Sequence, residues 1–125
     1  MRFMMLMIPN VRDENWMPSP EAVAAMTKFN QSLTKAGVLL SLDGFHPPSK
    51  GAHVSFSGGK PKVADGPVGG RDRPIGGYWM IDVKSKTEAV EWASRCPAAD
   101  GDVIEIRQVA EMSDFPPEVQ KAATA

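Results

Sequence analysis

Two residues of the sequence, His46 and Asp65, could together carry out proton transfer. His46 follows the apolar segment VLLSLDGF and precedes Pro47-Pro48, which restrict the backbone and would fix the direction of the imidazole. A histidine is the natural general base near neutral pH, and a partner carboxylate sets its tautomer. Asp65 would supply that carboxylate. The alternative for His46 is a loop histidine that caps main-chain carbonyl groups.

Asp65 stands in KVADGPVGG, where the same residues also make a good turn. In Asp-Gly-Pro the aspartate bonds nearby amides, the glycine supplies a positive φ and the proline stiffens the chain behind it. In the functional interpretation the carboxylate lies at the mouth of the sheet and orients a histidine or accepts a proton. The two interpretations are compatible, because a turn can hold a functional carboxylate rigidly.

Arg107 and Tyr78 are candidate ligand-binding residues. Arg107 and Glu105 alternate with two isoleucines in VIEIRQV, so they share one face of a strand. Arg107 could hold a carboxylate or enolate group of a ligand, or form a salt bridge between subunits. Tyr78 could line the same cavity, although an aromatic residue in a central strand is more often part of the core.

The third candidate ligand-binding residue, Arg71, lies in a glycine-rich segment. Gly69-Gly70 and Gly76-Gly77 bracket Arg71-Asp72-Arg73, which suggests a mobile flap over a cleft or an ordinary exposed loop. His46, His53 and the single Cys96 make no metal-binding pattern, and nothing points to a bound cofactor. His53 opens a strand and is expected to be exposed. Cys96, beside Pro97, is expected to be a small buried hydrophobe.

Composition limits the classes of function. The chain has 125 residues, which suits one domain, and a net charge of −1, which gives no electrostatic reason to expect a nucleic-acid partner. No apolar run approaches the roughly 18 residues of a membrane helix. The opening MRFMMLMIP resembles a signal peptide only faintly, and we interpret it as a strand. One cysteine requires no oxidising compartment, so a cytoplasmic location is the expectation.

Periodicity predicts strands over 2–8, 38–45, 77–83 and 103–109, and a hairpin around Ser57-Gly58-Gly59-Lys60. One helix begins at the N-cap Ser19 and ends at Gly37. A second begins at the capping box Ser85-Lys86-Thr87-Glu88, in which Glu88 reaches back to the Ser85 N–H, and stops at Pro97. We expect at most a short helix in the tail.

This order of elements predicts an α+β fold, the ferredoxin-like split βαβ arrangement with an inserted β-hairpin. Its two helices would cover the same face of an antiparallel sheet. Because the first strand and most of GYWMIDV are apolar on their other face too, something must cover that face. A second copy of the chain is the simplest cover, so we expect a homodimer with its sheets face to face. The alternative is a monomer whose tail folds across the sheet.

The chain resembles YCII-related proteins of the DGPF type, in RFMMLMI, in AGVLLSLDGFHPPSKGAHVSFSGGKPKVADGP, and in GGYWMIDVKSKTEAVEWASRCP followed by EIRQV. The resemblance covers roughly residues 2 to 110. It implies an α+β domain over 1–112, followed by a C-terminal extension over 113–125, and assembly as a dimeric α+β barrel. The phenylalanine of the motif is Val68 here, and Gly69-Gly70-Arg71-Asp72-Arg73 replaces the usual acidic stretch.

For function, the resemblance implies a site for a small molecule in a cavity of the dimeric barrel. A His–Asp pair is proposed as a site in some members, which points to His46 and Asp65 here. Proton transfer on a small carbonyl or carboxylate compound would need no metal or bound cofactor. A non-catalytic binding or regulatory partner protein is the alternative, so whether the chain is an enzyme stays open.

Overall fold

The computed structural model describes residues 1–10, 16–69 and 73–124. The helices and strands follow one another as β1 (Arg2–Ile8), α1 (Pro20–Lys35), β2 (Leu39–Gly44), β3 (Ala52–Ser57), β4 (Lys60–Asp65), β5 (Gly77–Asp82), α2 (Lys86–Ser94), β6 (Val103–Gln108) and α3 (Pro117–Ala123). Two short 3-10 turns, η1 (Pro48–Lys50) and η2 (Met112–Asp114), lie between them. The predicted order of strands and helices is confirmed. In the part of the chain that the structure describes, no helix is both long and apolar enough to cross a membrane.

The helix ends follow the capping pattern, with two corrections at α2. At α1, Ser19 accepts a hydrogen bond from the Ala22 N–H at 3.1 Å. At α2, Ser85 Oγ accepts from the Glu88 N–H at 3.2 Å, as expected. The return bond was expected to reach the N–H of Ser85 but comes instead from the N–H of Lys84, at 3.0 Å. The helix also ends at Ser94, three residues before the predicted stop at Pro97.

Four strands form one antiparallel sheet in the order β2-β5-β1-β6. Helix α1 joins β1 to β2, and β5 lies between these two strands in the sheet. This arrangement is the split βαβ unit of the ferredoxin-like fold. Strands β3 and β4 pair only with each other in a separate sheet. Gly58 and Gly59 join them with φ of 58° and 76°, as a tight two-residue hairpin turn requires.

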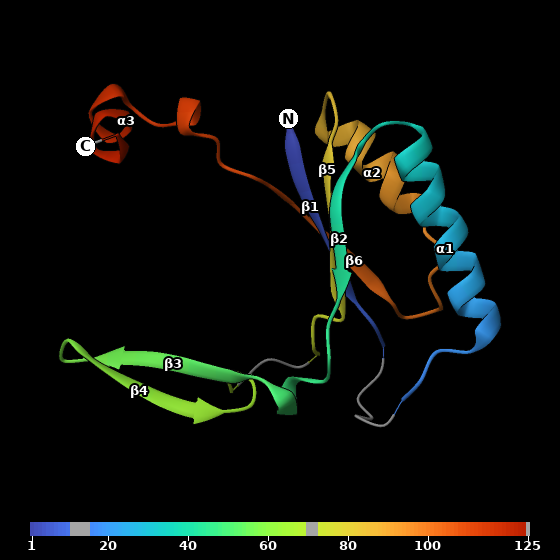
Figure 1. Cartoon of the computed structure of the whole chain (residues 1–125), viewed down its shortest axis with the longest axis horizontal. Helices are drawn as coiled ribbons and strands as arrows, with labels where there is room; N and C mark the ends of the chain where they lie inside the picture. The colour runs from blue at the N-terminus through green and yellow to red at the C-terminus, as the bar shows by residue number, and fades with distance from the viewer. Residues whose placement is uncertain (11–15, 70–72, 125) are drawn as a thin grey trace.

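The hydrophobic core lies between the sheet and helices α1 and α2, which cover the same face (Figure 1). Alternate residues of the central strands point into it, and Met5 and Ile81 are fully buried. The indole of Trp79 packs edge-on against Phe29, with ring centroids 5.6 Å apart. Its Nε1 donates a hydrogen bond to Asn30 Oδ1 at 2.8 Å, so the polar atom of this core residue is satisfied.

None of the described helices lies against the other face of the four-stranded sheet, and we call this the open face (Figure 1). Residues paired directly across antiparallel strands share a face. Since alternate residues of the central strands point into the core, the residues between them lie on the open face. The apolar members contributed by the central strands β1 and β5 are Met4, Leu6, Ile8, Tyr78 and Met80, each of them half-buried. The prediction that the central strands are apolar on both faces is confirmed.

Two segments project from the body of the protein on the side away from the helices: the hairpin of β3 and β4, and the C-terminal segment with α3 (Figure 1). One face of the hairpin is apolar and exposed, with 50% of Val54, 74% of Phe56 and 68% of Val63 accessible. The C-terminal segment exposes Met112, Phe115 and Val119. A lone two-stranded hairpin is marginally stable in water, so an apolar face of this kind needs a cover.

An ion pair fixes the start of the C-terminal segment to the first strand. Arg2 donates two hydrogen bonds to the Glu111 carboxylate, at 2.6 and 3.0 Å. Glu111 in turn is the N-cap of η2, and its N–H donates to Asp114 Oδ2 at 2.8 Å. The hydrogen bond from Arg2, with a smaller contribution from its charge, lowers the pKa of Glu111 below its ordinary value.

Because the pKa of Glu111 is lower in the folded state, its ion pair stabilises the protein at pH values above the unfolded pKa of glutamate, about 4.3. The stabilisation disappears as the pH falls through the folded-state pKa. We expect Glu111→Gln to lower the free energy of unfolding slightly at neutral pH and not at all in acid. Urea unfolding at both pH values measures this difference. Glu118→Gln is the control, since Glu118 has no ion pair with any described residue. An equal loss in both variants would contradict the prediction.

Candidate functional site

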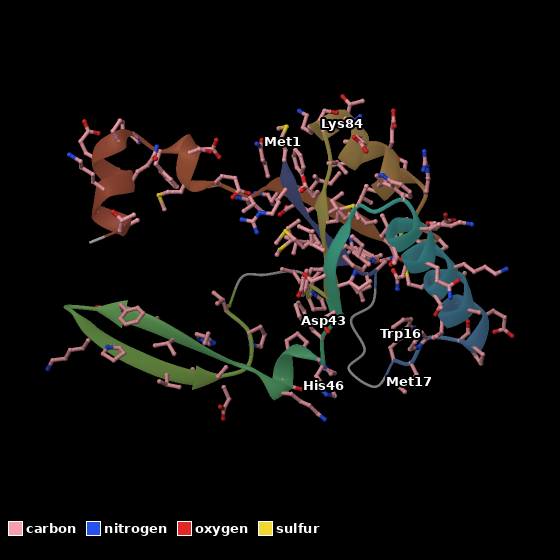
Figure 2. All side chains as sticks on the ribbon, turned by 45° about the horizontal axis from the view of Figure 1, so that its top comes forward. Met1, Trp16, Met17, Asp43, His46 and Lys84 are labelled. Carbon is pink, nitrogen blue, oxygen red and sulfur yellow. The ribbon has the colours of Figure 1, made fainter. Side chains whose placement is uncertain are left out.

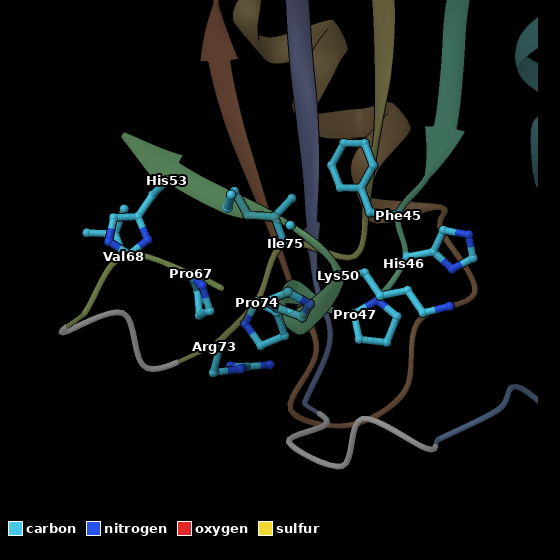
Figure 3. A pocket seen from close by; sticks show the side chains of 13 residues that line it. Phe45, His46, Pro47, Lys50, His53, Pro67, Val68, Arg73, Pro74 and Ile75 are labelled. Carbon is cyan, nitrogen blue, oxygen red and sulfur yellow. The ribbon is translucent and has the colours of Figure 1, made fainter. Parts of the chain in front are cut away.

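A pocket of about 600 Å³ lies where the hairpin leaves the sheet, and we call it the hairpin pocket (Figure 3). Two stretches line it: the chain from the end of β2 to the start of β3, and the chain between β4 and β5. Its lining consists of Phe45, His46, Pro47, Pro48, Lys50, Gly51, Ala52, His53, Pro67, Val68, Arg73, Pro74 and Ile75. The walls are therefore mostly apolar, with a few basic groups, as is common for small-molecule sites.

Main-chain hydrogen bonds hold the two stretches together. The Phe45 N–H donates to the Gly76 carbonyl at 2.9 Å, and the Gly66 N–H donates to the Gly51 carbonyl at 2.9 Å. Gly77 must be a glycine because a Cβ there would lie 2.6 Å from the carbonyl oxygen of Asp43. These contacts fix both walls of the hairpin pocket to the edge of the sheet.

The Asp65-Gly66-Pro67 segment is a turn at the base of the hairpin. Gly66 is buried and has a φ of +85°, which favours glycine. The ring of His53 closes the turn, with Nδ1 2.9 Å from the Gly66 carbonyl. Because a carbonyl only accepts, this Nδ1 carries the hydrogen and leaves Nε2 as the acceptor of a neutral ring. The expectation that His53 is exposed is wrong, since it is half-buried and lines the pocket.

His46 lines the hairpin pocket and is exposed, at the point where the chain leaves β2 (Figures 2 and 3). Asp65 ends β4, is exposed, and is outside the lining. Neither of these two described residues forms a hydrogen bond or ion pair with the other. The structure therefore places one member of the predicted pair at the pocket and the other beside it. Their joint role in proton transfer stays a prediction.

The other three predicted residues lie outside the hairpin pocket or outside the described residues. Tyr78 is on the open face, where its OH donates to Asp43 Oδ2 at 3.3 Å and its ring lies 6.0 Å from that of Phe45. Arg107 is on the same face and pairs with Glu105 of its own chain at 3.8 Å. Arg71 falls outside the described residues.

Arg73 connects segments that are distant in the sequence. Its guanidinium donates to three main-chain carbonyls, those of Ile8 at 2.9 Å, Pro9 at 3.2 Å and Gly101 at 2.7 Å. These bonds tie the chain before β5 to the end of β1 and to the turn before β6. The acceptors are neutral carbonyls, so the positive charge of Arg73 is not cancelled by them.

Sequence reasoning did not identify Lys50, His53 and Arg73 as pocket residues. For Lys50 a signal was available, because the prolines that fix His46 also begin η1, which brings the following lysine to the same loop. For Arg73 the signal was the glycine-flanked loop, which suggested a flap over a cleft. For His53 there was none, since its position depends on a contact with Gly66 that only the folded chain creates.

The described residues contain no group of three or more His, Cys, Asp or Glu side chains that could hold a metal ion. Cys96 is half-buried beside Met26, with 4.0 Å between the two sulfur atoms. Burial raises the pKa of its thiol to about 11, with a smaller contribution from the charge of Asp102. The thiol is therefore protonated at neutral pH and packs as a small hydrophobe.

Comparison with known proteins identifies the family of the chain. No curated protein matches the sequence. A family model described as "YCII-related domain" matches residues 1–113, which include the four-stranded sheet, helices α1 and α2, the hairpin and every described residue of the pocket. The resemblance to YCII-related proteins is thereby confirmed, and the chain belongs to the YCII-related family.

Proposed function

We propose that the protein is a homodimer that binds a small molecule in the hairpin pocket. The observation that carries this proposal is the pocket itself. Its volume of about 600 Å³ lies within the range of small-molecule sites, roughly 300–1,000 Å³. Apolar walls formed by Phe45, Ile75 and four prolines would desolvate a ligand, and a few polar side chains at their edge would orient it.

The open face supports the homodimer. Met4, Leu6 and Met80 form a contiguous apolar surface on the central strands, and a soluble protein rarely leaves such a surface uncovered. The hairpin and the C-terminal segment both project on this side and both expose apolar side chains. A second copy related by a two-fold axis would bring matching apolar surfaces together, and the two sheets would then form the dimeric α+β barrel.

The C-terminal segment supports a second copy over the monomer alternative. A tail that covered its own sheet would have to turn back over the open face. Here α3 lies away from the sheet (Figure 1), and Phe115 and Val119 are exposed instead of packed on the central strands.

Proton transfer by His46 on the bound molecule is a second candidate function, favoured by its position at the edge of the pocket. Asp65 would orient its ring in this account. Binding without chemistry is the alternative, and the exposed Asp65 outside the pocket lining supports it.

An NMR titration of the two histidines with pH, in the native protein and in Asp65→Asn, separates these functions. We expect the variant to fold and to keep its mass in solution, because asparagine preserves the turn. If the carboxylate acts on His46, removing its charge lowers the titration midpoint of His46. Identical midpoints for His46 in both proteins would exclude the pair, and binding alone would remain.

Small-molecule binding itself is tested with a fragment library in the same experiment. Fragments that bind in the hairpin pocket should shift the ring signals of His46 and His53, since both rings line it. A library that shifts neither ring, in a protein that is folded and dimeric, would overturn the proposal.

A further inference from the structure

We infer that the hairpin pocket selects small organic anions, with a carboxylate or similar acidic group on an apolar body. This inference rests on the proposed small-molecule function and names the chemical class of its ligand. The basis is the charge of the lining. Each polar side chain of the described lining is basic, namely His46, Lys50, His53 and Arg73, and no aspartate or glutamate is among the described lining residues.

The described part of the chain places no carboxylate against the two cations of the lining, since none of its carboxylates lies within salt-bridge distance of Lys50 or Arg73. Arg73 is held by the carbonyls of Ile8, Pro9 and Gly101, so its charge is fixed beside the pocket. Asp65 is nearby in the sequence, but its exposed carboxylate is outside the lining. The described lining therefore carries a net positive charge, and concave apolar walls strengthen the potential of such a charge.

The basic groups are arranged around apolar walls. In Figure 3 the side chains of His46 and Lys50 project to one side of the pocket and that of His53 to the other, with Phe45 and Ile75 between them. An acidic group would pair with the Lys50 ammonium and accept a hydrogen bond from an imidazole, while the apolar body of the ligand packed on Phe45 and Ile75. Arg73, whose Nε and Nη2 donate to main-chain carbonyls, would contribute mainly its charge.

The test compares acids with their neutral amides, which have nearly the same size and shape. Benzoate, phenylacetate and 2-furoate are titrated into the full-length protein alongside benzamide, phenylacetamide and 2-furamide, and the histidine ring signals are followed by NMR. We expect each acid to bind at least about tenfold more tightly than its amide, a difference of about 1.4 kcal/mol. Added salt should weaken binding of the acids and leave that of the amides unchanged.

Two variants locate the effect. Lys50→Gln should remove most of the preference for acids and leave the affinity of the amides nearly unchanged. Lys62→Gln is the matched control, because Lys62 lies on β4 outside the pocket lining and carries the same charge. Amide-proton spectra confirm that both variants fold.

Three results would overturn the inference. Amides that bind as tightly as acids would leave small-molecule binding intact and remove only the anion preference. Equal losses in Lys50→Gln and Lys62→Gln would show a general effect of net charge instead of recognition in the pocket. Failure of both acids and amides to shift either ring, together with failure of the wider fragment library, would remove the proposed function as well.

Discussion

The Met80→Lys variant should fold and yet be monomeric. Met80 lies at the centre of the open face, paired with Met4 of β1 on one side and Ser41 of β2 on the other. In a single chain its side chain is half-buried, so a lysine there can extend its ammonium into water. Between two packed sheets the same ammonium, and its copy related by the two-fold axis, would be buried without partners.

We therefore expect the dissociation constant of the proposed dimer to rise at least about a hundredfold, which is about 2.7 kcal/mol. Light scattering after size exclusion measures this as a fall from twice the chain mass of 13.5 kDa to the chain mass itself. Val90→Lys is the matched control, because Val90 is an exposed residue on α2, an element on the far side of the sheet. Its mass should equal that of the native protein.

A native protein of 13.5 kDa in solution would contradict the homodimer directly. So would a well-folded Met80→Lys with unchanged mass, because the open face would then not be the interface. A monomeric Val90→Lys would place the contact on the helices instead. Circular dichroism of each variant shows whether a change of mass accompanies loss of the fold.

Most of the fold could be predicted because it depends on local patterns. Alternation along β1 and β5 assigns residues to two faces, and Ser19 and Ser85 mark where helices begin. The order of elements then implies the four-stranded sheet. The sequence alone could not tell which of the two apolar faces the helices cover, because Met4 and Met5 are equally apolar. In the structure, Met5 is in the core and Met4 is on the open face.

The candidate site was harder to predict because it depends on contacts between distant segments. His46 was found from its prolines, which restrict the chain locally. The position of Arg73 requires the end of β1 and the turn before β6 to meet, which no local pattern encodes. His53 was expected to be exposed because it opens a hairpin strand, and the carbonyl of Gly66 turns it inward.

The sequence around Asp65 predicts two compatible roles for it, as part of a turn and as a functional carboxylate. The turn is confirmed, since Gly66 has the positive φ that Asp-Gly-Pro predicts. The hairpin pocket lies beside this turn, but of Asp65, Gly66 and Pro67 only Pro67 lines it. A sequence motif can thus mark the position of a pocket correctly while its most reactive residue lies outside the wall.

Ile81, the residue next to Met80, should give the opposite result when it is replaced by lysine. Its side chain is 0% exposed, in the core between β5 and the two helices. An ammonium there would have neither water nor a partner, and the cost exceeds what a domain with about 5–15 kcal/mol of stability can absorb. We expect Ile81→Lys not to fold, with loss of the near-ultraviolet signal of the buried tryptophans.

Ile81→Ala tests the burial of the Ile81 side chain as a change in the free energy of unfolding. It removes buried methyl groups without adding charge, so it should lower the free energy of unfolding by about 2–5 kcal/mol in urea titrations. Val90→Ala, at an exposed position of α2, is the control and should change it by less than about 0.5 kcal/mol. A folded Ile81→Lys would refute the assignment of faces, and with it the choice of Met80 for the interface. If instead Ile81→Lys does not fold and Met80→Lys folds as a monomer, two consecutive residues of β5 separate folding from assembly, because only Ile81 faces the helices.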